Sequence, residues 1–456
     1  MKTDNIEIFE RMPVSKAVIA LVVPTIISQI ITVIYNMADT FFIGQMDDPA
    51  QVAAATLIMP IFMMLTGFAN LFGIGGASYI SRSLGIKDND KARKSASFSI
   101  WGAIGIAIAY GVAIFALRPL LLPFIGADAS TYQYCSDYLF WTVTIGGIPT
   151  VLSACLSHLV RAEGYSKEAS IGIAFGGIMN IILDPVFIFG LKLGVSGAAI
   201  ATMLSNVLAT IYFIILIHKN REKTIIKFSI QHFTLKYGIP KELLLVGFPS
   251  FIMMLMGTVS NLCLNKVVVS YSNELIAGMG IAKRIDMLAF AVATGLTQGV
   301  LPLIAYNYGA KKYQRMRESI KTSFFYGFMV SVVSTIFLFF GATNIVRLFI
   351  NNTETVSYGQ YFLKIICVPT PAVVGAMMII TIFQATGKKI RPLILSMLRK
   401  GLLDIPFMYL MNHVVGSSGI PWATLIADVL TFVISICLFV PYCKNIGLQE
   451  ERKEEY

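Results

Sequence analysis

Long apolar segments without charges constrain this chain more than any other feature, as in residues 103–117 and 211–217. A helix needs about 20 mainly apolar residues to cross a lipid bilayer. Only 13% of the 456 residues are charged, whereas soluble proteins have about 25%. This deficit of charge argues against a water-soluble enzyme and against a nucleic-acid-binding domain. The runs are continuous, which favours helices over the alternating segments of about 10 residues in a membrane β-barrel.

The apolar segments form two sets of six. The first set covers residues 14–43, 52–81, 93–117, 132–160, 168–190 and 194–217, and the second covers 241–270, 275–307, 319–342, 356–385, 391–412 and 419–442. We therefore expect an all-α integral membrane protein with twelve transmembrane helices. It would have an N-lobe at 1–217, a cytoplasmic linker at 218–240 and a C-lobe at 241–456.

The two halves repeat each other at an offset of about 225 positions. Pro24 matches Pro249, and Arg-Ala-Glu-Gly at 161–164 matches Gln-Ala-Thr-Gly at 384–387. Each half has an even number of crossings, so both halves enter the bilayer from the same side and the repeats are parallel. Two similar lobes around a central cleft are typical of transporters that expose one site to each side in turn.

Positive charges occur in alternate loops. The net charge is +11, and basic residues gather at 82–94, at Arg161 and Lys167, at 219–241, at 311–321 and at 388–391. The positive-inside rule places these loops in the cytoplasm. We therefore expect a multi-pass protein of the cytoplasmic membrane with both termini in the cytoplasm. We interpret the charges as solvated anchors that set this topology, not as contacts to nucleic acid.

Two acids fall inside apolar segments of the first half. Placing a charged side chain in the bilayer centre costs about 2.5–3.5 kcal/mol on insertion scales, so Asp39 and Asp184 need a reason to be there. Asn180 shares a helix face with Asp184, and Thr202 lies at a similar depth in the next segment. These four oxygen-bearing residues suit Na⁺, for which they would be the metal ligands, or a shared proton. The alternative is a hydrogen-bond network that merely joins three helices.

The second half lacks that acid pair, because the position that matches Asp39 is Leu264. It contains charges of both signs instead. They are Lys283, Arg284, Asp286, Arg399, Lys400, Asp404 and Asp428. Lys283 with Asp286 and Lys400 with Asp404 have the spacings at which helix side chains pair. We favour internal ion pairs, and the alternative is contact with substrate or passage of protons.

Catalytic and nucleotide-binding motifs are absent from the sequence. It contains no His-Glu-x-x-His, no Gly-x-Ser-x-Gly and no phosphate-binding Gly-x-x-x-x-Gly-Lys-Ser/Thr. We therefore expect no enzyme activity and no cofactor, and transport would have to use an ion gradient.

Three local motifs resemble the multidrug and toxic compound extrusion (MATE) family. They are Tyr-Asn-Met-Ala-Asp at 35–39, Asn-Ile-Ile-Leu-Asp-Pro at 180–185 and Gly-Ala-Ala-Ile-Ala-Thr at 197–202. Arg284, Arg399 and Asp428 are similar to residues of its bacterial branch. The resemblance implies drug:cation antiport, with a cation site at Asp39, Asn180, Asp184 and Thr202. Tyr35 and Asn36, in the first motif, are candidate contacts to substrate or to the cavity.

The predicted function is a secondary antiporter. It would export amphipathic, often cationic drugs in exchange for H⁺ or Na⁺ by alternating access, as a monomer in the lipid bilayer. One alternative is a flippase for lipid-linked oligosaccharides, whose anionic substrate needs a basic cavity such as Lys283, Arg284 and Arg399 could line. An alternative of another class is a membrane enzyme or receptor, against which the duplication and the absent motifs argue.

Overall fold

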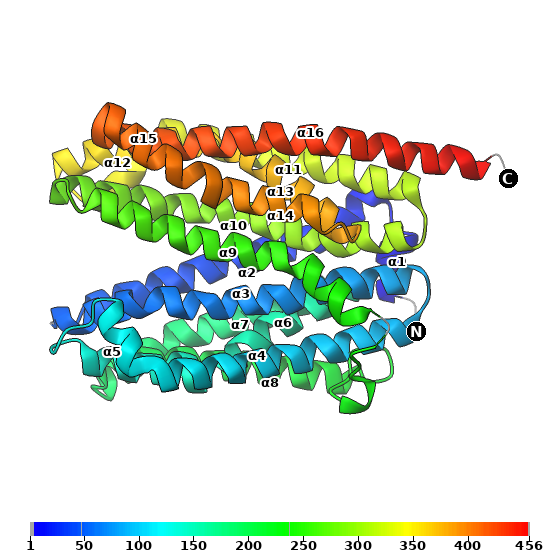
Figure 1. The fold of residues 1–456 in the computed structure, drawn as a ribbon, viewed down its shortest axis with the longest axis horizontal. Helices are drawn as coiled ribbons and strands as arrows, with labels where there is room; N and C mark the ends of the chain where they lie inside the picture. The colour runs from blue at the N-terminus through cyan, green and yellow to red at the C-terminus, as the bar shows by residue number, and fades with distance from the viewer. Residues whose placement is uncertain (1–3, 47, 237, 455–456) are drawn as a thin grey trace.

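Helices make up the fold of this chain. The computed structural model describes residues 4–46, 48–236 and 238–454, and every regular element in this part of the chain is helical. The outermost residues of the two predicted lobes, 1–3 and 455–456, lie outside the described residues. The expected all-α fold is confirmed (Figure 1).

The first lobe contains seven α-helices and follows a short N-terminal helix, α1 (Asp4–Glu10). Its helices are α2 (Val14–Gly44), α3 (Pro49–Gly85), α4 (Asn89–Phe124), α5 (Tyr132–Leu139), α6 (Gly147–Ala162), α7 (Ser166–Pro185) and α8 (Gly194–Lys219). Two π-helical turns, η1 (Phe140–Ile145) and η2 (Val186–Gly190), follow α5 and α7. Aspartates cap two of the long helices, because Asp48 accepts a hydrogen bond from Ala50 N and Asp88 accepts one from Lys91 N.

The second lobe follows a linker with one 3₁₀ turn, η3 (Ile230–His232). Its helices are α9 (Ile239–Val268), α10 (Asn273–Gly309), α11 (Tyr313–Arg347), α12 (Thr353–Cys367), α13 (Thr370–Ala385), α14 (Ile390–Met397), α15 (Asp404–Val415) and α16 (Ile420–Glu454). The π-helical turn η4 (Leu398–Leu403) joins α14 to α15, and the 3₁₀ turn η5 (Gly416–Gly419) joins α15 to α16.

These helices account for twelve membrane crossings in the part of the chain that the structure describes. Nine helical segments are long and apolar enough to span a membrane, and two pairs bent by 46° and 43° (α5–α6 and α12–α13) raise the number to eleven. One of these segments, Ile390–Lys444, has 55 residues and would measure about 80 Å if straight. It turns back at η5, where Gly416 has φ +70°, and therefore crosses twice.

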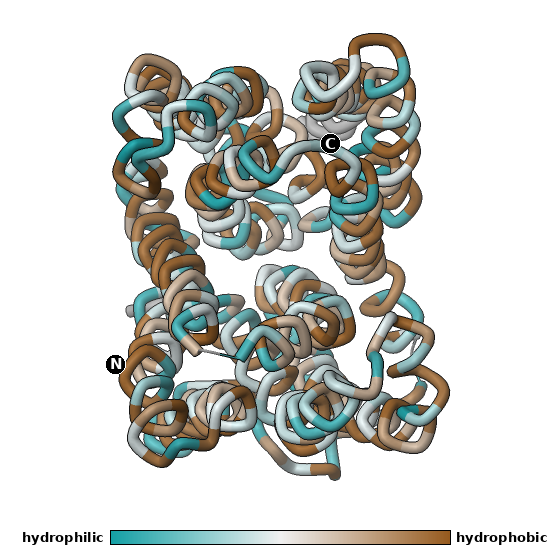
Figure 2. The backbone as a smooth tube through the Cα atoms, turned by 90° about the vertical axis from the view of Figure 1, so that its left-hand side faces the viewer, coloured by the Kyte–Doolittle hydropathy of each residue, from teal (hydrophilic) through white to brown (hydrophobic). Residues whose placement is uncertain are grey.

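The two lobes lie one above the other with their helices roughly aligned, as the end-on view of Figure 2 shows. Both termini lie at the same end of the molecule (Figure 1). At this end the lobes touch through glycines whose missing side chains let backbones approach closely. A Cβ at Gly75 or Gly247 would overlap backbone atoms of α9 or α3, respectively, and one at Gly299 would overlap α2.

The outward faces of the bundle are apolar. On α11, for example, Phe325, Phe328, Val333, Phe337 and Phe340 are all more than half exposed. Such a surface would be unfavourable in water but is expected next to lipid tails. This exposure agrees with the membrane location that the composition predicts.

Candidate functional site

The four predicted coupling residues come from three helices of the first lobe and gather at one place. Asn180 and Asp184 on α7 are almost completely buried, with 1% and 0% of their surface exposed. Asn180 Nδ2 donates a hydrogen bond to Asp184 Oδ1 (3.1 Å) and lies 3.5 Å from Thr202 Oγ1 on α8. Asp39 on α2 lies close enough to Asp184 for the two carboxylates to interact electrostatically.

This cluster has more acceptors than donors. Asp39 Oδ1, Asn180 Oδ1 and Asp184 Oδ2 are buried and have no hydrogen-bond partner. Within the described residues, no lysine or arginine forms an ion pair with either carboxylate. Buried polar atoms in proteins are nearly always satisfied, so these three oxygens are free to accept a proton or a cation. Oxygen atoms alone are the ligands that hard cations prefer.

Tyr35 and Asn36 lie on α2 one turn before Asp39, and both are partly buried. The Tyr35 ring packs against Gly177 on α7, where an added Cβ would come within 2.8 Å of it. Asn36 Nδ2 donates to the carbonyl of Thr32 (2.8 Å). Tyr35 therefore sets the distance between the two helices that carry the acids, and the contacts of Asn36 are within its own helix.

The charges of the second lobe are paired differently. Arg399 Nε donates to Asp428 Oδ1 (2.8 Å), and 5% of each side chain is exposed. Lys400 Nζ lies 3.6 Å from Asp404 Oδ2, which also accepts a hydrogen bond of 2.6 Å from Ser260 Oγ. Each of these two acids therefore has a cation beside it. Arg399 and Lys400 both lie on the π-helical turn η4, an irregularity that the sequence pattern does not predict.

The expected ion pair between Lys283 and Asp286 does not form, since no contact within 4 Å joins the two side chains in the described structure. Lys283 lies within electrostatic range of Lys400 and of three acids, Asp404, Asp286 and Asp428, so Asp286 is only one of the charges around it. Arg284 is exposed on the same helix. Four of the seven predicted residues thus form ion pairs, and Lys283 and Asp286 lie beside them.

Three polar residues at the contact between the lobes were not singled out by their sequence pattern. Arg161, which the pattern places among the cations of a cytoplasmic loop, is in fact 2% exposed at the end of α6. Its Nη1 lies 3.5 Å from Gln298 Oε1 on α10, and this oxygen accepts a hydrogen bond from Gln29 Nε2 on α2 (2.9 Å). Arg161, Gln29 and Gln298 lie far apart in the sequence and share no periodic pattern, so only the fold shows that they meet.

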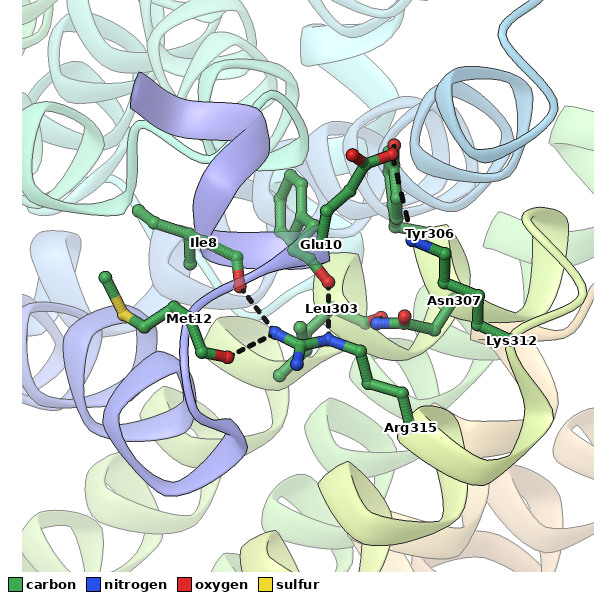
Figure 3. A network of polar contacts seen from close by, with 9 residues as sticks. Ile8, Glu10, Met12, Leu303, Tyr306, Asn307, Lys312 and Arg315 are labelled. Atoms are coloured by element: carbon green, nitrogen blue, oxygen red, sulfur yellow. Dashed lines mark hydrogen bonds and ion pairs between the residues drawn. The ribbon is translucent and has the colours of Figure 1, made fainter. Parts of the chain in front are cut away.

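The N-terminal segment binds to the second lobe (Figure 3). Arg315 on α11 donates hydrogen bonds to the carbonyls of Ile8, Phe9 and Met12 at 3.2, 2.7 and 2.6 Å. Tyr306 OH donates to Glu10 Oε1 (2.7 Å), and this bond is the main reason that the pKa of Glu10 is lowered. The segment therefore joins the start of the first lobe to α10 and α11.

Two further contacts close the same end. Arg82 on α3 lies 3.7 Å from Glu242 on α9, and Ser78 Oγ donates to the carbonyl of Gln384 on α13 (2.6 Å). Leaving the linker aside, every hydrogen bond or ion pair between the lobes in residues 4–46, 48–236 and 238–454 lies in the half that contains the termini. The lobes are thus joined at one end, while Asp39 and Asp184 lie toward the other.

Glu163 joins the linker to the first lobe. It lies in the turn between α6 and α7, is 8% exposed, and accepts hydrogen bonds from Thr224 Oγ1 (2.6 Å) and Ile225 N (2.7 Å). Burial raises the pKa of this carboxyl group to about 7, although the two hydrogen bonds act in the opposite direction.

Comparisons with known proteins agree with this architecture. The MatE family model matches residues 24–186 and 249–410, one stretch in each half. The chain is 33% identical over 431 residues to the multidrug export protein MepA of Staphylococcus aureus (strain MSSA476), covering 94% of each protein. It is 31% identical over 443 residues to MepA of Staphylococcus haemolyticus (strain JCSC1435), covering 97% of this chain and 96% of the relative.

Solved structures share the fold. A crystal structure of a MATE protein in complex with MaL6 has a TM-score of 0.91 at 24% identity and covers 98% of this chain and 100% of that one. An outward-facing multidrug resistance MATE family transporter of the MOP superfamily has a TM-score of 0.88, also at 24% identity, and covers 98% of this chain and 99% of that chain.

Proposed function

Because the chain belongs to the MATE family of bacterial multidrug efflux transporters, we propose that it exports amphipathic, often cationic compounds in exchange for H⁺ or Na⁺. The chain is a multi-pass membrane transporter and not an enzyme. The exchange for an inward-moving cation is the part of this proposal that rests on the site itself.

The observation that carries the proposal is the set of three buried oxygens without donors on Asp39, Asn180 and Asp184. A proton or Na⁺ that binds there neutralises charge which no basic residue of the described structure compensates. A ligand shifts a conformational equilibrium only by binding one state more tightly than the other. Asp39, Asp184 and Thr202 are contributed by α2, α7 and α8, respectively, so a bound cation draws these helices together and changes the shape of the first lobe.

The direction of transport follows from where the lobes touch. We place the end with both termini in the cytoplasm, because the basic loops lie there. The structure is then closed toward the cytoplasm, and the acid cluster accepts a cation from outside. Binding of that cation favours release of the drug to the exterior, and return of the cation to the cytoplasm completes the exchange.

The flippase alternative loses one of its three basic residues in the structure. An anionic pyrophosphate headgroup needs basic residues that are free to face it, and Arg399 is instead paired with Asp428. The relatives that the chain matches are multidrug export proteins. We therefore do not propose lipid transport for this chain.

Efflux from proteoliposomes tests the proposal. The purified chain is reconstituted, and movement of ethidium, a lipophilic cation, is followed by fluorescence while an Na⁺ gradient and a pH gradient are imposed separately. We expect one gradient to drive ethidium against its own gradient and the other to have little effect. Ethidium movement that ignores both gradients would contradict antiport.

A further inference from the structure

Arg161 is a buried cation without an anion. It is among the largest fully buried side chains of the molecule. Within the described residues, no carboxylate lies within 4 Å of its guanidinium group, and its Nε has no hydrogen-bond partner. Its contact with the neutral Gln298 oxygen is long, at 3.5 Å. Removing a charge from water without a partner costs several kcal/mol, so this residue opposes the closed arrangement in which it lies.

The position of Arg161 connects this cost to the movement of the lobes. Arg161 belongs to the first lobe and Gln298 to the second, and Gln298 also bonds to Gln29. Gln298 lies eleven residues before the end of α10 at Gly309, or about 16 Å from that end. The three side chains therefore lie inside the contact that seals the termini end. Separation of the lobes at this end would hydrate Arg161, and closure buries it again.

A second arginine at the same contact, Arg82, differs from Arg161 because it has an anionic partner when the lobes are closed. Arg82 also reaches from the first lobe to the second, but it meets the carboxylate of Glu242 at 3.7 Å. When the lobes close, Glu242 of the second lobe therefore becomes the counter-ion of Arg82. Arg161 instead contacts the neutral amide of Gln298, which also bonds to Gln29, and none of the described acids lies within 4 Å of it. In this closed arrangement an anionic partner for Arg161 would have to come from outside the described part of the protein.

We propose that Arg161, with Gln29 and Gln298, forms a recognition site for an anionic group carried by the substrate, in practice a carboxylate. This inference rests on the proposed export function and names the residues that would distinguish an amphiphile with a carboxylate from one without it. A zwitterion entering from the cytoplasm presents its carboxylate to Arg161 while the lobes are apart. The pair then lowers the cost of burying Arg161, so that substrate binding favours closure of the cytoplasmic end.

Arginine suits this role. Its guanidinium group has five N–H donors in a planar arrangement that matches a carboxylate. A hydrogen bond to a charged group contributes about 1.5–3 kcal/mol, which corresponds to roughly 10- to 100-fold in binding at 1.4 kcal/mol per tenfold. A cation without a carboxylate receives no such contribution. The proposal therefore predicts a difference between two dyes that differ only at this group.

Rhodamine 110, a zwitterion, and rhodamine 123, its methyl ester and a permanent cation, provide that comparison. Both are loaded into proteoliposomes that contain the full chain, and gradient-driven export is measured. We expect the wild type to export both dyes. Arg161→Gln should lower export of rhodamine 110 by tenfold or more and leave rhodamine 123 within about twofold. Arg161→Lys should retain most rhodamine 110 export, because it keeps the positive charge.

Two controls separate recognition from mere closure. Arg82→Gln removes an arginine that is already paired and should change the export of both dyes to the same extent. Gln298→Glu places a carboxylate beside Arg161 from the other lobe, so it should reproduce the selective loss of rhodamine 110 export. The Gln298 variant also keeps the test decisive should Arg161→Gln fail to reach the membrane.

Three results would overturn the inference. The first is an equal effect of Arg161→Gln and Gln298→Glu on both dyes, or no effect on either. The second is a wild type that exports rhodamine 123 alone. The third is export of both dyes that falls together when chloride is replaced by gluconate, since a free anion would then be the partner of Arg161. A wild type that exports neither dye would contradict the proposed function itself.

Discussion

The two lobes repeat the same fold, but Asp39 and Asp184 of the first lobe lie in different surroundings from Asp404 and Asp428 of the second. In the first lobe, Asp39 and Asp184 have no basic partner among the residues that the structure describes, and oxygens of both are without donors. In the second lobe, Asp428 is paired with Arg399 and Asp404 with Lys400. An acid with a permanent cation has little to gain from a visiting proton or Na⁺, whereas an acid without one is ready to bind it. We therefore propose that ion coupling takes place in the first lobe and that the paired charges of the second lobe support its structure.

The largest effect should follow from neutralising the first-lobe acids. Asp184→Asn keeps the shape of the side chain but removes the charge that attracts H⁺ or Na⁺. We expect gradient-driven ethidium export to fall by at least 100-fold, and Asp39→Asn to act similarly. Export from proteoliposomes measures the effect, and size-exclusion chromatography in detergent shows whether the variants remain folded.

Asp137→Asn is a matched control, because this acid lies in the first lobe on α5, bonded to the side chain of Gln133 at an exposed position. It should leave export unchanged. Normal export by folded Asp39→Asn and Asp184→Asn variants would remove the functional distinction between the two lobes.

The second lobe should respond with a loss of stability. Asp428→Asn leaves Arg399 buried without its charged partner, and breaking a buried ion pair on one side costs about 3–5 kcal/mol. We expect the melting temperature in detergent to fall clearly. The fraction of the variant that remains folded should still show gradient-driven export.

Replacing both partners sharpens this test. Arg399→Met with Asp428→Leu removes both charges at once, and such replacements are often neutral for stability. We therefore expect the double variant to recover most of the lost stability and to export ethidium. A stable double variant without gradient-driven export would instead place a coupling residue in the second lobe.

The membrane crossings and the repeat could be predicted from the sequence because both depend on apolar character averaged over many residues. Apolar segments of 20 or more residues leave few choices in a membrane, and the fold agrees with twelve of them. Asp39, Asn180, Asp184 and Thr202 could be grouped because acids inside apolar segments are rare. The helix irregularities could not, since the π-helical turns at 140–145, 186–190 and 398–403 depend on packing between helices.

Arg161 shows a second limit of sequence reasoning. A basic residue at the end of an apolar segment looks like a loop anchor, and most such residues are. Its burial depends on the approach of α10 from the other half of the chain, which no local pattern contains. Glu163, two residues later, is similar, because its burial depends on Thr224 and Ile225 of the linker.

Glu163 also distinguishes the lobes, since the matching position in the second repeat is Thr386. The pKa of Glu163 is about 7 in the fold, against 4.5 ordinarily, so the folded state prefers the protonated acid. The resulting stabilisation is complete below about pH 4.5 and is lost as the pH rises through 7. It amounts to roughly 3 kcal/mol. Melting temperatures between pH 4.5 and 8 should fall with increasing pH, and Glu163→Gln should weaken this dependence.

Glu222→Gln is the control for this titration, because Glu222 is an exposed acid of the same linker. It should melt with the pH dependence of the wild type. An unchanged pH dependence in Glu163→Gln would show that another group is responsible.

The smallest effect should come from the N-terminal segment, which belongs to the first lobe in sequence but is bonded to the second. Arg315→Ala removes three hydrogen bonds to the carbonyls of Ile8, Phe9 and Met12. These groups lie near water at the end of the molecule and find new partners there, so we expect a loss of only about 1 kcal/mol. The segment is also held by the hydrogen bond between Tyr306 and Glu10. Because this bond lowers the pKa of Glu10, its contribution to stability is present at neutral pH and is lost as the pH falls through the acidic range. Glu10→Gln should therefore remove the acid-dependent part of the loss in melting temperature, and Lys321→Ala, at an exposed position of α11, should change nothing. An effect of Arg315→Ala as large as that of Asp428→Asn would mean that the segment is a main support between the lobes.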